Sequence, residues 1–189
     1  AKFNELKKAY AAGTELRGKT LGIIGFGRIG QEAAKIAIGL GMKVIASDPF
    51  VEKATIQLDF FDGQSASFRL STISINEVLQ QADFITLHVP AQKEYVIGAK
   101  EIALMKDGAG IVNAARGGVI DEVALVDALD KGKLSFAGLD TFENEPTPAI
   151  KVLMHNKISL TPHIGAATAE AQDRIGTELA EQISQLLKK

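Results

Sequence analysis

The segment LGIIGFGRIGQEAAKIAIGLGMKVIASD, residues 21–48, constrains the fold of this chain more than any other stretch. It begins with the short apolar run Leu21–Ile24, which is typical of a buried strand. The glycine-rich Gly25–Gly30 follows, and Gln31–Leu40 then has the apolar spacing of a helix. A second apolar run, Met42–Ala46, leads to Asp48. This order of strand, glycine turn, helix, strand and acid predicts a βαβ unit.

The glycines of GFGRIG have the spacing that a dinucleotide-binding turn requires. Gly25 allows the tight turn, Gly27 lets the backbone approach a pyrophosphate, and Gly30 lets the helix pack close to the strand. The helix N-terminus adds unpaired N–H groups and a partial positive charge for the phosphates. Asp48, 18 residues after Gly30, can accept hydrogen bonds from both hydroxyls of an adenosine ribose and would repel a 2′-phosphate. The segment therefore predicts NAD rather than NADP; the alternative is a tight βαβ turn with a solvated Asp48.

The composition is that of an ordinary globular protein and excludes several classes of partner. Of the 189 residues, 46% are hydrophobic and 23% are charged, and the formal net charge is −2, so we expect no basic surface for nucleic acid. No apolar run approaches the roughly 18 residues of a membrane span, and no signal-peptide pattern is present. Cysteine is absent, which excludes disulfides and thiolate metal sites and fits a cytoplasmic protein.

Beyond residue 48, predicted strands and helices alternate along nearly the whole chain. We expect side-chain caps at Ser74, Asp121 and Thr168 to begin three of the helices. Val51–Leu58 is expected to form a short helix, and Phe60–Ser71 to be irregular with a short strand at 67–70. The other expected elements are strands at 84–89, 110–113, 135–139 and 157–160 and helices at 3–10, 74–81, 100–105, 121–131 and 168–187. The alternation predicts one doubly wound α/β domain, residues 1–189, with a parallel sheet and helices on both faces.

Polar residues and bends gather where the predicted strands end, which is the side of the ligand crevice in such sheets. Arg116 follows one strand and has two glycines beside it, so its guanidinium can hold a carboxylate in a two-pronged grip. His163, with Glu145 as its neighbour, would have its tautomer fixed and its protonated form favoured, and could then give a proton to a carbonyl oxygen. Singly, these residues could be a surface charge, a turn residue and a turn carboxylate. Together at strand ends they indicate a catalytic set.

Four motifs carry a resemblance to a known family. In this order, GFGRIG with Asp48, NAARGGVIDE, LDTFENEP and TPHIGAAT resemble the NAD-binding domain of the D-isomer-specific 2-hydroxyacid dehydrogenases. The resemblance covers nearly the whole chain and is weakest at residues 60–71. The segments ITLHVP and AATAEAQDR favour the branch that oxidises 3-phosphoglycerate in serine biosynthesis, with reductases of glyoxylate or hydroxypyruvate as the alternative.

The resemblance implies a role for each matched residue. Arg116 would bind the substrate carboxylate and carbonyl, His163 would be the general acid and base, and Glu145 would favour its protonated form. The substrate would be a small 2-hydroxy or 2-keto acid, and NAD the cofactor. Self-association as a homodimer is a further expectation. The residues implied to contact NAD are Gly25, Gly27, Arg28, Ile29, Gly30, Asp48, Val89, Pro90, Ala114, Arg116, Asp140, His163, Gly165 and Ala166.

One departure from the family is large. Its members carry a separate substrate domain, built mostly from residues ahead of the first strand, and this chain begins almost at the glycine motif. We therefore expect a cofactor domain that binds NAD, with the substrate domain absent and with little turnover alone. The competing interpretations are a non-catalytic NAD-binding unit and an NAD-responsive scaffold similar to the corepressors that keep this fold. Nothing in the sequence resembles the added recognition tail of the latter.

Three further residues are interpreted as structural. His88 is expected to be a satisfied histidine at a strand end, and His155 an exposed residue at a helix end. Glu143 is expected to be solvated. Neither histidine has carboxylates at metal-ligand spacing, so no metal site is predicted.

Overall fold

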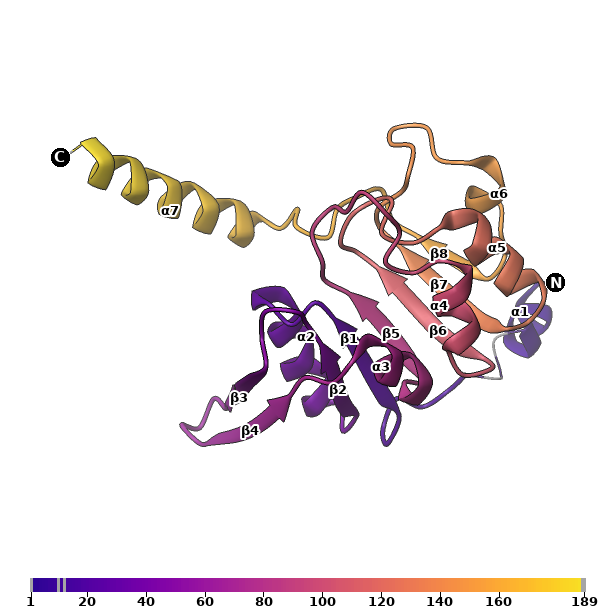
Figure 1. Ribbon diagram of the computed structural model, residues 1–189, viewed down its shortest axis with the longest axis horizontal. Helices are drawn as coiled ribbons and strands as arrows, with labels where there is room; N and C mark the ends of the chain where they lie inside the picture. The colour runs from indigo at the N-terminus through magenta and orange to yellow at the C-terminus, as the bar shows by residue number, and fades with distance from the viewer. Residues whose placement is uncertain (1, 10, 12, 188–189) are drawn as a thin grey trace.

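The computed structural model describes residues 2–9, 11 and 13–187, and its centre is a six-stranded parallel sheet (Figure 1). The strands are β1 (Thr20–Ile24), β2 (Lys43–Ser47), β5 (Phe84–Leu87), β6 (Ala109–Asn113), β7 (Leu134–Leu139) and β8 (Ile158–Leu160), in the spatial order β2-β1-β5-β6-β7-β8. The chain runs outward from β1 to β2 and then returns to β5 on the other side of β1. The order therefore reverses between β1 and β5, where an open α/β sheet forms its ligand crevice.

Helices cover both faces of the sheet, as the alternation of elements predicts. On one face lies α2 (Arg28–Gly39), whose Ala34 packs with Ile23 of β1. On the other face, Ile24 joins the core formed with α3 (Ile75–Gln81), α4 (Ala99–Leu104), α5 (Glu122–Asp130) and α6 (Ile150–Leu153). Because successive strand residues point to opposite faces, β1 contributes to two cores. The predicted doubly wound α/β fold is confirmed.

The three predicted helix caps are present. Ser74 and Glu77 form a reciprocal capping box at the start of α3. Asp121 Oδ1 accepts hydrogen bonds from two backbone N–H groups of α5, both at 3.0 Å. Thr168 Oγ1 accepts from Ala171 N at 3.1 Å at the start of α7 (Ala169–Leu187). Each cap satisfies N–H groups that have no partner inside the helix.

The prediction for residues 51–71 is wrong except for the short strand at 67–70, which lies within β4. Instead of a helix and an otherwise irregular stretch, β3 (Lys53–Asp59) and β4 (Ser65–Ser71) form an antiparallel hairpin. The side chains alternate with period two: Ile56 is buried against α2, whereas the flanking Thr55 and Gln57 are exposed. Alternation over seven residues in each strand outweighs the weak helical spacing. The interpretation of His155 as a helix-end residue implies a helix before it, and α6 is the single turn found there; four residues are too few for a helical period to predict its bounds.

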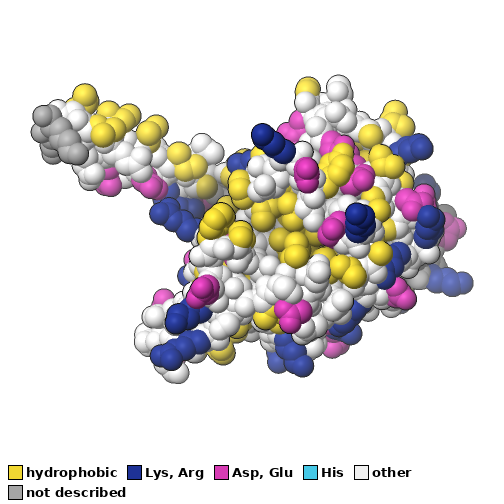
Figure 2. Space-filling model, in the orientation of Figure 1, with side chains coloured by type: hydrophobic (Ala, Val, Ile, Leu, Met, Phe, Trp, Pro, Cys, Tyr) yellow, Lys and Arg dark blue, Asp and Glu magenta, His cyan; other side chains and the backbone are white. Residues whose placement is uncertain are grey.

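The two terminal helices differ from the rest. The helix predicted at 3–10 is observed as α1 (Phe3–Ala9), and Tyr10 lies outside the described residues. Helix α7 extends away from the sheet (Figure 1), and none of its described residues is buried. Its apolar side chains recur every three or four residues, and Figure 2 shows hydrophobic groups along this helix. Within the described residues, every helix is too short or too polar to cross a membrane.

Candidate active site

The glycine loop lies at the point where the strand order reverses. Gly25 follows β1 with φ +93°, and a Cβ atom there would overlap the carbonyl of His88 at the end of β5. A Cβ on Gly30 would overlap the carbonyl of Gly25, so α2 begins in close contact with the loop. A Cβ on Gly27, in contrast, would meet no atom of the described residues within 4 Å, which leaves the helix N-terminus approachable. This loop fits the pyrophosphate of a dinucleotide.

The carboxylate of Asp48 is fixed against this loop by backbone groups. Its Oδ2 accepts from Phe26 N at 2.6 Å, and its Oδ1 accepts from Phe50 N at 2.8 Å and Val51 N at 3.1 Å. A carboxylate has about four lone-pair sites, so capacity remains for a ribose hydroxyl. A negative charge at this place would repel a 2′-phosphate, so the arrangement fits NAD rather than NADP.

Asn113 shapes the loop that carries Arg116, a role that its sequence motif does not reveal. Its side chain accepts from Ala115 N at 3.0 Å and donates to Arg116 O at 2.9 Å. The residue is 2% exposed, so these bonds fix the loop from beneath. The Arg116 side chain is exposed and donates from Nη1 to Ala115 O at 2.6 Å. Most of its donors are left for an incoming carboxylate.

Asp140 holds the backbone around His163. Its Oδ1 accepts from Thr161 Oγ1 at 2.6 Å and from Ile164 N at 2.8 Å, and its Oδ2 accepts from Gly165 N at 2.8 Å. His163 itself has φ 54°, a left-handed conformation that costs about 1–3 kcal/mol for a residue other than glycine. Burial alone would raise the pKa of Asp140, but these hydrogen bonds outweigh burial and hold the pKa below its usual value.

Glu145 holds the imidazole ring of His163. Its Oε2 lies 2.8 Å from His163 Nδ1, and its Oε1 accepts from Phe142 N at 2.9 Å. The bond with His163, followed by the bond from Phe142, lowers the pKa of Glu145. An ionised Glu145 can only accept, so Nδ1 must carry the proton. Nε2 is then left to exchange a proton with a ligand.

The remaining predicted residues lie at the same edge of the sheet. Val89 contacts the glycine loop, because its Cγ1 would lie 3.0 Å from a Cβ on Gly25. Gly165 packs against Asp140 and Ala114. The side chains of Arg28 and Ile29 are exposed on the first turn of α2, and those of Pro90 and Ala166 are exposed on loops at this edge. An apolar cavity of about 460 Å³ opens beside His163 and Glu145; it is also lined by Phe142, Pro146, Pro148, Leu153, Leu160, Thr161 and Pro162.

Two of the three residues interpreted as structural need correction. His88 agrees with its interpretation: it is largely buried, bonds to Thr86 Oγ1 at 3.1 Å, and has its pKa lowered by burial. His155 is not exposed; its side chain is only 9% accessible and lies 3.2 Å from Asp130. Glu143 is not simply solvated, because its carboxylate accepts from Glu122 N at 2.9 Å. Both errors arise from partners more than 20 residues away in sequence.

Comparisons with known proteins agree with this geometry. Residues 2–165 match the model of the D-isomer specific 2-hydroxyacid dehydrogenase family, NAD binding domain. Over 178 residues the chain is 48% identical to D-3-phosphoglycerate dehydrogenase of Methanocaldococcus jannaschii, covering 93% of this chain and 32% of that protein. Over 187 residues it is 46% identical to hydroxypyruvate reductase of Thermotoga maritima, covering 96% of this chain and 57% of that protein. The chain thus spans about a third to under two thirds of these relatives.

Solved structures include similar folds. A glyoxylate reductase from Paecilomyes thermophila superposes with a TM-score of 0.80 at 37% identity, covering 94% of this chain and 52% of that chain. A D-2-hydroxyisocaproate dehydrogenase gives a TM-score of 0.81 at 30% identity, covering 99% of this chain and 59% of that chain. The sheet order and the strand-end loops described above are therefore those of a dinucleotide-binding domain.

Proposed function

The chain belongs to the family of D-isomer specific 2-hydroxyacid dehydrogenases, and from this membership we propose that the complete protein interconverts a D-2-hydroxy acid and its 2-keto acid. NAD is the cofactor of this domain and, when bound, accepts or supplies the hydride. The observation that carries the proposal is the Glu145–His163 pair, 2.8 Å apart, on the same edge of the sheet as the glycine loop.

We assign the binding of NAD to the loops that follow β1, β2, β5, β6, β7 and β8. The N–H groups at the start of α2, beside Gly27, would hold the pyrophosphate, with Arg28 and Ile29 against it. Asp48 would accept from the adenosine ribose. Further contacts along the cofactor are assigned to Val89, Pro90, Ala114, Asp140, Gly165 and Ala166.

The chemical roles follow from the hydrogen bonds of each side chain. Glu145 keeps the proton of His163 on Nδ1, so Nε2 can take a proton from a hydroxyl or return it to a carbonyl oxygen. Arg116 has exposed guanidinium donors that can grip the substrate carboxylate in two parallel bonds. The apolar cavity opens beside the pair and the His163 side chain is 47% exposed, so a ligand can reach the ring.

For the substrate, we propose 3-phosphoglycerate, with hydroxypyruvate or glyoxylate as the second candidate. The first is supported by identities of 48% and 42% to the D-3-phosphoglycerate dehydrogenases of Methanocaldococcus jannaschii and Mycobacterium leprae. The second is supported by 46% identity to the hydroxypyruvate reductase of Thermotoga maritima. Both candidates use the same Arg116, Glu145 and His163.

The first experiment is a calorimetric titration of the chain with NADH and, separately, with NADPH. We expect saturable binding of NADH and much weaker binding of NADPH, because Asp48 repels the 2′-phosphate. Asp48→Ala should weaken NADH binding and reduce the discrimination. Equal affinity of the wild type for both cofactors would contradict the role of Asp48.

The second experiment measures turnover of the complete protein with each candidate substrate. Oxidation of 3-phosphoglycerate with NAD at a higher kcat/KM than D-glycerate supports the first candidate. Preference for reduction of hydroxypyruvate or glyoxylate supports the second. NADH binding without turnover of any 2-hydroxy or 2-keto acid would reject a dehydrogenase and leave a cofactor-responsive binding protein.

A further inference from the structure

Two carboxylates outside the proposed catalytic set bind each other's backbone. Glu122 is the first residue of α5, and Glu143 lies on the loop that follows β7, which we call the 140–145 loop. Glu122 N donates to Glu143 Oε1 at 2.9 Å, and Glu143 N donates to Glu122 Oε1 at 2.8 Å. These reciprocal bonds tie the start of α5 to the 140–145 loop at two points.

Burial of the Glu122 carboxylate makes this pair of bonds costly in free energy. Glu122 is 6% exposed, and burial, with a smaller contribution from the charge of Glu143, raises its pKa. Asp121 already accepts two N–H groups at the start of the same helix. Asp121 leaves the N–H of Glu122 without a partner inside the helix, and Glu143 accepts it. The return bond from Glu143 N to Glu122 then fixes the 140–145 loop to the start of α5.

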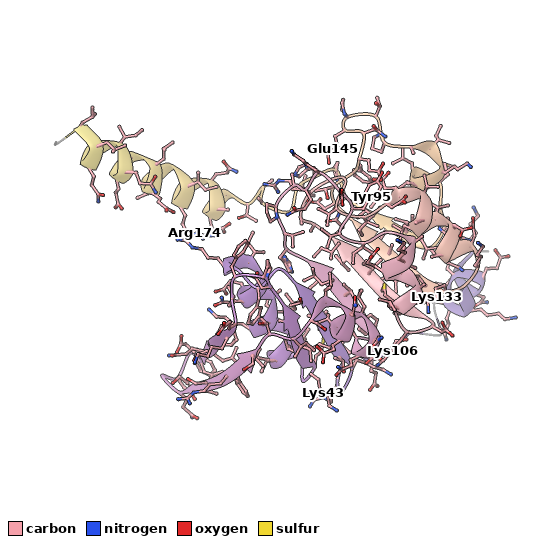
Figure 3. The ribbon with its side chains drawn as sticks, in the orientation of Figure 1. Lys43, Tyr95, Lys106, Lys133, Glu145 and Arg174 are labelled. Atoms are coloured by element: carbon pink, nitrogen blue, oxygen red, sulfur yellow. The ribbon has the colours of Figure 1, made fainter. Side chains whose placement is uncertain are left out.

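Tyr95, on a third segment, senses the charge of the same carboxylate. It lies half-exposed between β5 and α4, and Figure 3 shows it at the same end of the sheet as Glu145. The negative charge of Glu143 is the main cause that raises the pKa of the Tyr95 phenol. The phenol therefore reports on the charge of Glu143, whereas the hydrogen bonds with Glu122 hold the 140–145 loop.

Phe142 transmits the position of Glu143 to the candidate catalytic residues. Its N–H donates to Glu145 Oε1 at 2.9 Å, beside the bond from Glu145 to His163. Its carbonyl lies where a Cβ on Gly117 would be, so the loop packs directly on the residue that follows Arg116. A shift of Glu143 must therefore move Phe142, and with it the support of Glu145.

We propose that Glu122 and Glu143 are positioning residues that hold the 140–145 loop so that Glu145 stays on Nδ1 of His163. The proposal rests on the proposed function, in which Glu145 and His163 form the acid–base pair. The two residues act through Phe142 and Glu145. Their removal leaves the ring of His163 free to exchange its proton between Nδ1 and Nε2.

The test is the tautomer of His163, measured by long-range ¹H–¹⁵N NMR correlation on the folded chain. The chain has three histidines, so His163→Gln assigns the signals. The wild type should carry its proton on Nδ1. In Glu143→Ala, the ¹⁵N chemical shifts of the two ring nitrogens should move toward each other as the tautomers mix. Glu143→Gln keeps an acceptor for Glu122 N and should restore the wild-type signals.

Glu77→Ala is the matched control, because it also removes a carboxylate that accepts a backbone N–H, here Ser74 N at 2.9 Å, but in α3. It should lower the melting temperature without changing the His163 signals. An unchanged tautomer in folded Glu143→Ala would overturn the proposal. If Glu143→Ala does not fold, Glu122→Ala decides by the same readout, since it removes the acceptor of Glu143 N and leaves the Glu143 carboxylate in place.

Two further measurements separate this proposal from the proposed function. The chain has two tyrosines and no tryptophan, so in a Tyr10→Phe background Tyr95 can be titrated by ultraviolet absorbance. Glu143→Gln should lower the pKa of Tyr95 toward its ordinary value. In the complete protein, Glu143→Ala should reduce kcat by up to about 100-fold with a nearly unchanged KM for NAD. If the His163 tautomer changes in Glu143→Ala but the complete protein shows no turnover, the proposed function is rejected and the positioning role of Glu143 stands.

Discussion

The two edges of the sheet hold their backbone with side chains of opposite charge. At the carboxyl ends of the strands, Asp140 and Glu143 accept hydrogen bonds from backbone N–H groups. At the amino ends, Lys133 and Lys157 donate to carbonyls where α4 and α5 end. Figure 3 shows Lys133, with Lys43 and Lys106, at the end of the sheet opposite Glu145. The intervening helices present their N-termini at one edge and their C-termini at the other, which favours Glu143 at the start of α5 and the lysines at the ends of α4 and α5.

The edges differ in what they leave for a ligand. At the amino edge, Lys106 pairs with Asp83 at 2.9 Å and Lys133 pairs with Asp107 at 2.8 Å, so these charges are used within the fold. At the carboxyl edge, the acids hold the backbone, while the side chain of His163 is 47% exposed. Helix dipoles thus stabilise both edges, and the carboxyl edge combines fixed loops with accessible donors at Arg116 and His163. Mutations at the two edges should therefore separate activity from stability.

The largest effect is expected for His163→Ala in the complete protein. Turnover should fall by about 10²–10⁴-fold, the range for loss of a general acid–base group. Affinity for NADH, measured calorimetrically, should remain nearly intact, because the glycine loop and Asp48 are unchanged. Full activity of this variant would remove His163 from the mechanism. The carboxyl edge would then have no demonstrated role in catalysis.

Asp140→Ala should affect both stability and activity. It leaves Ile164 N and Gly165 N without the acceptor that holds His163 in its left-handed conformation. We expect a loss of about 3 kcal/mol in the free energy of unfolding, since hydrogen bonds to a charged, buried group are removed. Urea unfolding followed by far-ultraviolet circular dichroism measures it. Undiminished stability would mean that Asp140 serves a ligand and not the loop.

At the amino edge, Lys133→Met should cost stability only. Its Nζ bonds to the carbonyl of Met105 at the end of α4, and its side chain is 26% exposed. We expect a loss of about 1 kcal/mol, measured by urea unfolding, with unchanged affinity for NADH. Lys131→Met is the control, because its ion pair with Asp127 is exposed and should contribute less. Weaker binding of NADH in Lys133→Met would contradict the assignment of ligand binding to the carboxyl edge and of stability alone to the amino edge.

Local signals account for the parts of the fold that the sequence predicts. The caps at Ser74 and Asp121 join groups two or three residues apart, so spacing alone indicates them. The strand ends were predictable because parallel strands deliver their termini to one edge, and this brought Glu145 and His163 together although 18 residues separate them.

The missed features depend on tertiary contacts. Glu122 and Glu143 are 21 residues apart, and their reciprocal bonds require the 140–145 loop to lie beside the start of α5. His155 contacts Asp130, which is 25 residues away in sequence. The hairpin of β3 and β4 depends on pairing between segments that are each ambiguous alone, and on burial of Ile56 against α2. No periodicity within one segment encodes such partners.

The smallest change in stability is expected from Glu122→Gln. Its dependence on pH should have the opposite sign to that of Asp140 and Glu145 at the same edge. Burial raises the pKa of Glu122 above its usual 4.5, so the folded chain keeps this proton to higher pH than the unfolded chain. Stability from Glu122 is therefore present below pH 4.5 and is lost as pH rises through the folded pKa. Asp140 and Glu145 have lowered pKa values, so their contribution is present above the usual carboxyl values and is lost as pH falls.

Comparing wild type with Glu122→Gln at about pH 4 and about pH 7 isolates this contribution, because Asp140 and Glu145 are common to both proteins. The glutamine keeps an oxygen that can accept from Glu143 N but carries no charge. Urea unfolding should show the variant gaining relative to wild type between the lower and the higher pH, by less than about 1 kcal/mol. A relative loss over this range would mean that Glu122 stabilises the fold through its charge, as Asp140 does. Glu122, Asp140 and Glu145 would then all stabilise the carboxyl edge through their negative charges.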